Sequence, residues 1–494
     1  MIAPNHGKKH PARLHRAPFY RRWKLPGWLA IPLVICWGLI SWWLGTSFPG
    51  IAEKKQQGFR KFIEQQVLIY DGWQKLTNAD ARLSRLSIDE VEFLTDMRDL
   101  YDQADVQGRV SGEAWLELAL LYHRFKDVEG VDYTQMYDIL ELDVSGDESI
   151  YAAVCQLWNE EEMSSEERTF FLEYYATQPN NWALNYLASQ HGMVDQQTLA
   201  ALAVRTDKYL WNYVLASGMM VLLILASLAL IWKLPTWLPA GEFPKRYRRW
   251  SSCWSVKNVM AAVAGLDLVG KAGVYGFILM AWIAMGIAAY GAFAAQQALL
   301  WVYMTVTVLL SLITFAFWAC ALIHLLTPGW RRFCETMGLT LQDFKNGRYW
   351  AAGVILATLT FLTFWLIELS MEALGLGGVS FSGLDRDMHE YGIFALPMMI
   401  VWACIMAPLV EEVIFRGFLY RVIQRRWGVF AGMMGSSVVF AYVHFYDTMG
   451  FFFIVLYGLL FCAVFQRTGK LTAGVILHCC INSLITWFGW MTNN

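Results

Sequence analysis

The sequence contains few charged residues. Asp, Glu, Lys and Arg make up 16% of its 494 residues, whereas hydrophobic residues make up 56% and aromatic residues 15%. A typical soluble domain carries about 25% charged residues, so this composition excludes an ordinary soluble protein. Long apolar runs cross a bilayer as helices, and we therefore predict an all-α, polytopic membrane helical bundle with an inserted soluble helical domain.

Cysteine motifs are also missing. The nine cysteines form no CxxC or Cys/His zinc pattern, and Cys155 is the one cysteine of the acidic segment described below. A single cysteine cannot form a disulfide within that segment. The sequence lacks HExxH as well, the helical zinc motif of many metalloproteases. These absences exclude a disulfide framework and favour a site without metal.

The charges that are present divide the chain into two environments. Residues 51–208 contain 29 acidic and 14 basic side chains, whereas the rest of the chain contains 12 acidic and 25 basic ones. Lys and Arg in short loops mark the cytoplasmic side of a membrane protein. We therefore expect the acidic segment to lie outside the cytoplasm.

Charge and hydropathy together predict five regions. They are a basic cytoplasmic tail (1–28), a first transmembrane anchor (29–48), an acidic extracytoplasmic helical domain (49–207), transmembrane helices with basic cytoplasmic loops (208–349) and a C-terminal membrane core (350–494). Nine spans are expected, near 29–48, 210–231, 273–296, 299–326, 350–371, 393–420, 428–446, 451–466 and 471–490. The N-terminus is then cytoplasmic and the C-terminus lies outside.

The stretch 407–421, APLVEEVIFRGFLYR, places charged side chains inside an apolar run. In a helix, Glu412 and Arg416 lie one turn apart on one face, and Glu411 lies about 100° round from Glu412. Each charge near the bilayer centre costs at least about 2.5 to 3.5 kcal/mol. Three charges in one span therefore predict that a polar cavity or a functional role keeps them there. The alternative is a helix that leaves the membrane at Glu411.

Two later spans contain further polar residues at one-turn spacing. His444 follows Phe440 by four residues in FAYVH, and His478 precedes Asn482 by four residues in HCCIN. Each histidine taken alone is typical of a hydrogen-bonded core or interfacial residue. Polar residues on three helices of one short region instead predict a shared site.

A glutamate beside histidines supports acid–base chemistry. Desolvation raises the pKa of a glutamate, whereas the nearby Arg416 lowers it. The balance of the two effects can give Glu411 or Glu412 a pKa suited to taking a proton from water. Histidine and amide donors can stabilise the oxyanion that follows. The residues thus predict hydrolysis of a peptide bond inside the bilayer, with no cofactor. Zinc held by Glu411, His444 and His478 is the alternative, with water as the fourth ligand.

EEVIFR, FAYVH and HCCIN resemble the motifs EExxxR, FxxxH and HxxxN of the CAAX prenyl endopeptidase and bacteriocin-processing family, also called CPBP or Abi. The resemblance covers roughly residues 350–490, and three ordered motifs on separate helices are specific. It implies a CPBP-like core at 350–494 and an intramembrane endopeptidase of the glutamic type. The family was first described as metalloproteases.

The resemblance also implies roles for the motif residues. Glu411 would activate water, with Glu412 assisting and Arg416 orienting the carboxylates. His444 would help to position the water. The oxyanion would be stabilised by His478 and Asn482.

Substrate, partners and location are expectations of the same kind. The substrate would be a membrane-embedded or lipidated peptide or protein, and the membrane the bacterial inner (plasma) membrane. The lipid bilayer and a protein bound by the acidic domain are the other expected partners, and no nucleic acid is expected. One alternative is a non-catalytic receptor or immunity protein that uses the acidic domain. Another is a transporter in which Glu411, Glu412 and His478 relay protons.

Overall fold

The computed structural model is helical throughout the part of the chain that it describes. Its described residues are 27–47, 89–106, 196–252, 254–265, 268, 320–324, 326–373, 400–444 and 448–493, with scattered positions between 63 and 77 and between 117 and 128. No strand occurs among them, which confirms the predicted all-α class. The expected spans 273–296 and most of 299–326, the basic tail and most of the acidic domain lie outside the described residues.

Four described helical segments are long and apolar enough to cross a membrane. They are Leu210–Trp237, Gly347–Ile367, Gly450–Thr468 and Leu471–Met491. The first comprises most of α10 (Gln196–Leu230) with η2 (Ile231–Lys233) and α11 (Leu234–Trp237), and the others lie in α17 (Gly347–Ala373), α21 (Thr448–Thr468) and α22 (Leu471–Asn493). They match four predicted spans, and they support an integral membrane protein.

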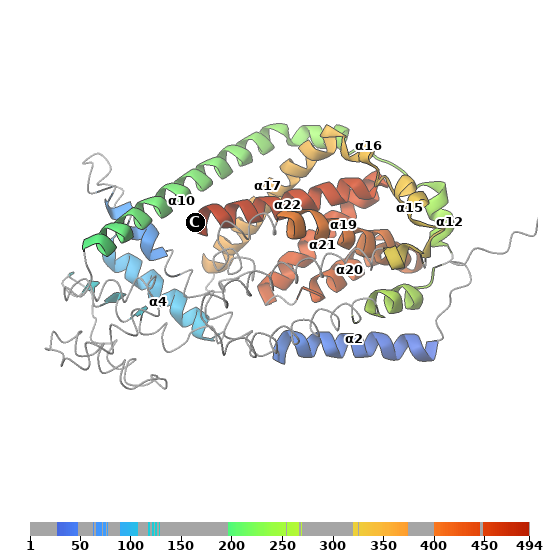
Figure 1. Cartoon of the computed structure of the whole chain (residues 1–494), viewed down its shortest axis with the longest axis horizontal. Coiled ribbons are helices and arrows are strands. Elements are labelled where there is room, and N and C mark those ends of the chain that lie inside the picture. The colour runs from blue at the N-terminus through green and yellow to red at the C-terminus, as the bar shows by residue number, and fades with distance from the viewer. Residues whose placement is uncertain are drawn as a thin grey trace, which may run out of the picture.

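The bundle is organised around α22. This helix packs along α17 and also contacts α10, α21 and the π-helical segment η3 (Ile400–Met406), while α20 (Arg421–Tyr442) packs along α21. Figure 1 shows α10 running from the end that holds α4 (Glu90–Val106) to the end that holds α16 (Leu341–Phe344). The first predicted span is the helix α2 (Gly27–Ser47), which lies along one edge of the same view.

Two glycines with positive φ separate the helices of the core. Gly428 (φ 93°) breaks α20 into two helical parts. Gly469 (φ 66°) forms the short connection between α21 and α22, and a Cβ there would lie 2.8 Å from the backbone oxygen of Glu242. A side chain at Gly469 would therefore meet both strain and a clash. The turn brings α21 and α22 together and seats the 242–243 backbone against their junction.

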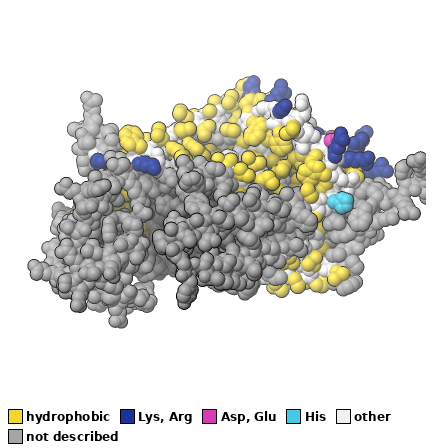
Figure 2. Space-filling view, viewed as in Figure 1, with side chains coloured by type: hydrophobic (Ala, Val, Ile, Leu, Met, Phe, Trp, Pro, Cys, Tyr) yellow, Lys and Arg dark blue, Asp and Glu magenta, His cyan; other side chains and the backbone are white. Residues whose placement is uncertain are grey.

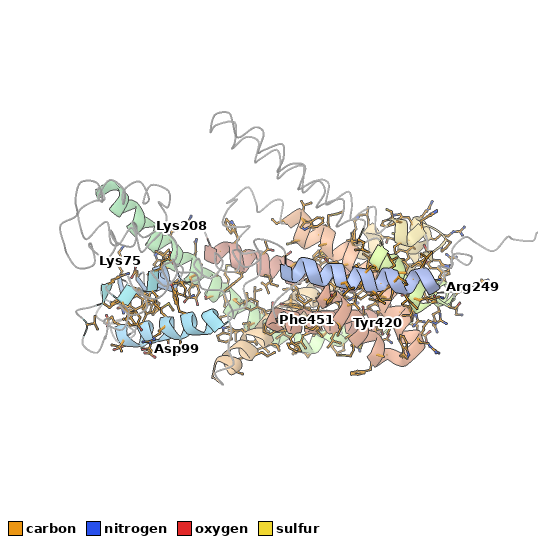
Figure 3. The ribbon with its side chains drawn as sticks, turned by 90° about the horizontal axis from the view of Figure 1, so that it is seen from below. Lys75, Asp99, Lys208, Arg249, Tyr420 and Phe451 are labelled. Carbon is orange, nitrogen blue, oxygen red and sulfur yellow. The ribbon has the colours of Figure 1, made fainter. Side chains whose placement is uncertain are left out.

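Basic side chains gather at one end of the molecule. Exposed Lys and Arg residues come from α12 (Lys245–Ser251), α15 (Trp330–Met337) and the region of α16, and Figure 2 shows Lys and Arg side chains above and to the right of a broad hydrophobic surface, with others at its left end. Arg249 marks this end in Figure 3, whereas Lys75 and Asp99 lie at the opposite end. Basic loops on one side of a membrane protein would produce such a cluster.

The described part of the acidic segment has a small core of its own. Tyr70 stacks on Phe93 with ring centroids 4.0 Å apart, and Phe125 meets both rings edge-on. Arg124 and Asp71 form an ion pair at 2.5 Å across 53 residues. These contacts join helices that are distant in sequence, as expected for a packed helical unit.

Candidate active site

The two glutamates lie where one helix type changes to another. Residues 400–420, the described part of the expected span 393–420, form η3, a short α-helix α19 (Ala407–Glu411) and a second π-helical segment, η4 (Glu412–Tyr420). Pro408 stands in the first turn of α19, where a proline is tolerated because its missing N–H has no helical partner. Glu411 ends α19 and Glu412 begins η4. Single π-helical turns inside helices are frequent at functional sites.

Glu412 is paired with Arg416 in the interior. Their side chains are fully buried, and Arg416 Nη1 lies 3.0 Å from Glu412 Oε1. The predicted one-turn contact between these residues is confirmed. Arg416 Nη2 donates to Gly458 O at 3.3 Å, which ties η4 to α21. A buried charge without its partner is strongly destabilising, so Glu412 and Arg416 each depend on the other to remain buried.

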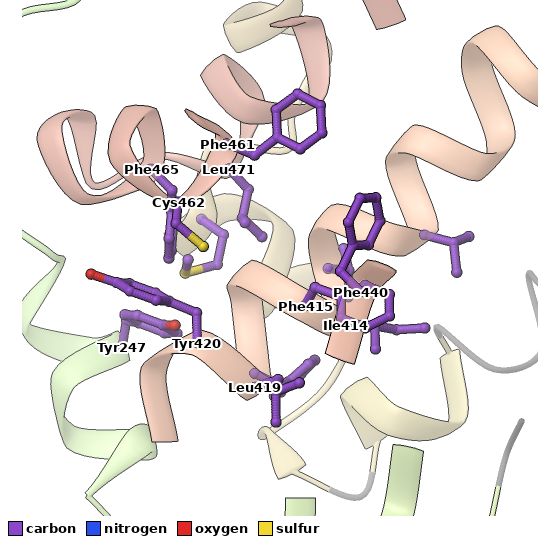
Figure 4. Close-up of a cluster of buried hydrophobic side chains, with 14 of the residues drawn as sticks. Tyr247, Ile414, Phe415, Leu419, Tyr420, Phe440, Phe461, Cys462, Phe465 and Leu471 are labelled. Carbon is purple, nitrogen blue, oxygen red and sulfur yellow. The ribbon is translucent and has the colours of Figure 1, made fainter. Parts of the chain in front are cut away.

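Aromatic rings enclose the guanidinium. The Arg416 Cζ atom lies 4.4 Å from the centroid of Phe440 and 4.8 Å from that of Phe461. Figure 4 shows these two phenylalanines on separate helices of the buried cluster. A planar cation between ring faces gains cation–π stabilisation, which is larger when water is excluded. Phe440, one turn before His444, therefore helps to hold Arg416 in the site.

His478 lies between the two glutamates. Its Nδ1 is 3.1 Å from Glu412 Oε1, its Nε2 is 3.7 Å from Glu411 Oε2, and its ring stacks on Phe461 at 4.4 Å. Because Glu412 Oε1 also faces the Arg416 guanidinium, we infer that Nδ1 carries the hydrogen and donates to this oxygen. In the neutral ring, Nε2 is then an acceptor directed at Glu411.

His444 approaches Glu411 from the end of α20. Its Nδ1 lies 2.7 Å from Phe440 O, and its Nε2 lies 3.9 Å from Glu411 Oε1. A backbone carbonyl only accepts hydrogen bonds, so Nδ1 carries the hydrogen and the neutral ring presents Nε2 as an acceptor. Glu411 thus faces the Nε2 atoms of two histidines, and its side chain keeps 15% of its surface exposed.

Asn482 lies one turn beyond His478 on α22. Its Nδ2 donates to Ala403 O in η3 at 2.7 Å, and the second amide hydrogen is not used by this bond. The structure thus brings five predicted residues into one cluster: Glu411, Glu412, Arg416, His444 and His478. Asn482 lies next to this cluster, on the helix that also carries His478.

Sequence patterns missed several residues that build this cluster. Phe461 and Gly458 come from α21, whose sequence is apolar on all sides and offers no signal that separates one position from another. Ser436, which donates to Phe415 O at 2.9 Å, lies in an ordinary small-residue pair. Within the described ranges, no group of three or more His, Cys, Asp or Glu side chains has a geometry suited to a metal ion.

The cluster lies in a part of the chain that is similar to known proteins. Residues 393–484 match the family model described as type II CAAX prenyl endopeptidase Rce1-like. These residues are similar to the CPBP family, and we refer to them below as the CPBP domain. The chain is also 30% identical over 100 residues to the "Putative membrane peptidase YdiL" of Bacillus subtilis (strain 168).

The match to the Bacillus protein is partial. It covers 19% of this chain and 38% of the relative, so the chain spans well under half of that protein's length. No solved structure matches this chain. The CPBP domain contains all six predicted site residues, whereas α2, α10, α12 and the acidic segment lie outside it.

Proposed function

We propose that this protein is an intramembrane endopeptidase in which Glu411 activates water. The observation that carries the proposal is the difference between the two adjacent glutamates. Glu412 is committed to Arg416 and His478, whereas Glu411 faces two histidine Nε2 atoms and keeps some exposure. A carboxylate that is not neutralised by a fixed cation can accept a proton from water.

The proposed reaction follows from these positions. We place the attacking water between Glu411 and a histidine Nε2, because two atoms that lie 3.7 to 3.9 Å apart can each be about 2.8 Å from one water oxygen. Glu411 takes one proton from this water while the water oxygen forms a bond to the peptide carbonyl carbon. The C–N bond then breaks, and the proton held by Glu411 passes to the leaving amine.

The oxyanion of the intermediate requires donors. His478 faces Glu411 through Nε2 at 3.7 Å, and this nitrogen can donate in the form of the ring that carries a hydrogen on both nitrogens. Asn482 retains one amide hydrogen beyond its bond to Ala403. These two groups are our proposed oxyanion donors, and His444 is the proposed water-positioning residue.

The surroundings of the cluster support the proposed substrate class. Glu411 and Glu412 lie beside α21 and α22, helices that are apolar enough to span a membrane. A membrane-embedded or lipidated peptide reaches such a site without leaving an apolar environment. The basic end of the molecule supports a cytoplasmic position for α12, α15 and α16. The bacterial inner membrane, an acidic domain on its outer side and a protein partner of that domain are the remaining parts of the proposal.

The test compares new peptide termini in the membrane proteomes of cells that produce wild type, Glu411→Ala or His478→Ala. Glu335→Ala is the matched control, because Glu335 forms an ion pair with Arg331 on the exposed face of α15. We expect one or more termini to disappear in both site variants and to persist in the control, at equal protein levels. If no terminus depends on Glu411, the protease proposal is wrong. The alternative to test is then a non-catalytic receptor that binds its partner through the acidic domain.

A second experiment addresses the metal alternative. Purified wild type is treated with a zinc chelator, assayed on a substrate found in the first experiment, and analysed for bound metal. Activity that persists without metal supports the glutamic mechanism. Activity that is lost on chelation and restored by zinc would assign Glu411, His444 and His478 to metal binding instead.

A further inference from the structure

The π-helical turn around Arg416 is held by two side chains from other helices. The Ser436 hydroxyl donates to Phe415 O at 2.9 Å, and the Tyr247 hydroxyl donates to Gly417 O at 2.7 Å. Both donors are fully buried. The two acceptor carbonyls belong to the residues immediately before and after Arg416.

The backbone at the end of η4 gives a reason why Gly417 O accepts an external donor. In a regular α-helix, Gly417 O would accept from the N–H of Arg421, four residues later. Here the Arg421 N–H donates to Phe418 O instead. Gly417 O thus does not receive the Arg421 N–H of a regular α-helix, and the Tyr247 hydroxyl supplies it with a donor.

The position of the Tyr247 hydroxyl is determined by its ring contacts. The ring lies 5.7 Å from Phe243, 5.9 Å from Trp254 and 6.3 Å from Phe465, measured between centroids. Figure 4 shows Tyr247 beside Tyr420, below the helices of the buried cluster. Burial raises the pKa of the Tyr247 phenol, so the hydroxyl keeps its proton and remains a donor.

Tyr247 comes from outside the CPBP domain. It belongs to α12, the helix KRYRRWS, whose Lys and Arg side chains are exposed while Tyr247 and Trp250 are buried. The domain matched by the family model begins at residue 393. A loop helix 170 residues away in sequence therefore reaches the backbone beside Arg416.

We propose that Tyr247 and Ser436 are positioning residues that keep η4 in its π-helical register. This register directs Arg416 toward Glu412 and Gly458, and Glu412 in turn orients His478. The proposal rests on the proposed protease function for its kinetic consequence. Its structural consequence, local protection of η4, is independent of any activity.

The experiment uses the full-length protein in lipid nanodiscs. Tyr247→Phe removes one hydroxyl and keeps the packed ring, and Tyr122→Phe is its matched control, because Tyr122 donates to Leu94 O in the acidic segment. Ser436→Ala is compared with Ser437→Ala, a neighbour that is equally buried and whose hydroxyl bonds to no carbonyl of η4 among the described residues. Hydrogen–deuterium exchange and cleavage kinetics are measured for each variant.

Tyr247→Phe and Ser436→Ala should speed exchange in peptides that cover 412–420 and leave the rest of the bundle unchanged. We also expect kcat to fall roughly 5- to 50-fold with KM within about twofold. Exchange at 412–420 equal to wild type in Tyr247→Phe overturns the proposal, as does an increase spread over the whole bundle. Wild type that cleaves nothing contradicts the proposed function alone, because exchange still tests the positioning role.

Discussion

The Nδ1 atom of His478 lies 3.1 Å from Oε1 of Glu412, although 66 residues separate them in the sequence. Glu412 also pairs with Arg416 at 3.0 Å, so one carboxylate oxygen orients a histidine and neutralises an arginine. The opposite nitrogen of His478 faces Glu411 at 3.7 Å. The adjacent glutamates therefore occupy different environments, and their substitutions should have different effects.

Glu412→Gln should destabilise the protein, whereas Glu411→Gln should leave its stability unchanged. Glu412→Gln leaves the fully buried Arg416 without its counter-charge, which costs about 3 to 5 kcal/mol. Glu411 is partly exposed and pairs with no permanent cation among the described residues, so Glu411→Gln should fold normally and lose cleavage. Protein levels in the membrane and thermal unfolding in detergent measure the difference.

A double variant provides the control for this prediction. Replacing both members of the pair, as in Glu412→Gln with Arg416→Met, removes the uncompensated charge and should recover most of the lost stability without restoring cleavage. Equal stability of the two single glutamine variants would show that the pair with Arg416 does not distinguish the glutamates.

Arg416→Lys should not be a conservative change. The guanidinium contacts Glu412, donates to Gly458 O and lies against the faces of Phe440 and Phe461. A lysine ammonium cannot reproduce this planar arrangement, so we expect a loss of about 2 to 3 kcal/mol of stability and a fall in cleavage. Lys233→Arg is a suitable control, since Lys233 lies over the ring of Trp232 away from the cluster. Stability of Arg416→Lys equal to wild type would contradict the packing argument.

Gly458→Ala should disturb the site by changing the packing of α21 against α20. A Cβ at this position would lie 2.7 Å from Ser437 Cβ and 2.9 Å from Ser437 Cα, so α20 and α21 must separate. The same residue supplies the carbonyl that Arg416 contacts. We expect a destabilisation of about 1 to 3 kcal/mol and reduced cleavage.

Gly218→Ala is the matched control on α10, because a Cβ there meets nothing within 4 Å. Alanine favours a helix over glycine, so this variant should be neutral or slightly stabilising. Unfolding temperatures of the two variants in the same lipid provide the comparison. A Gly458→Ala protein as stable and active as Gly218→Ala would show that the helices tolerate the added methyl group.

Alkylation of Cys334 should depend steeply on pH. Burial, followed by Cys320 and Glu335, raises the pKa of this thiol to about 11. The thiolate is the reactive form, so the rate at pH 8 should be roughly one thousandth of its limiting value and rise about tenfold per pH unit up to pH 10. Peptide mapping after timed alkylation measures it, and the denatured chain, with an ordinary thiol, should react at least 100-fold faster at pH 8. Equal rates in both states would place Cys334 at the surface.

The local part of this site could be predicted from the sequence because helices have a regular period. Residues four apart share a face, which is why the contact between Glu412 and Arg416 and the common face of His478 and Asn482 were foreseeable. Apolar runs long enough to span a bilayer likewise predicted α10, α17, α21 and α22. The three motifs pointed to the family that the comparison then found.

Contacts between helices were decided by the tertiary structure. No periodicity indicates that Arg416 reaches Gly458, that Phe461 stacks on His478, or that Tyr247 donates to Gly417 O. The change from α- to π-helical turns at Glu412 is also absent from the pattern of residues. The sequence determined which side chains share a face, because that depends on neighbours along one helix. Packing determined which carboxylate is neutralised and which faces the histidines, because that depends on how separate helices meet.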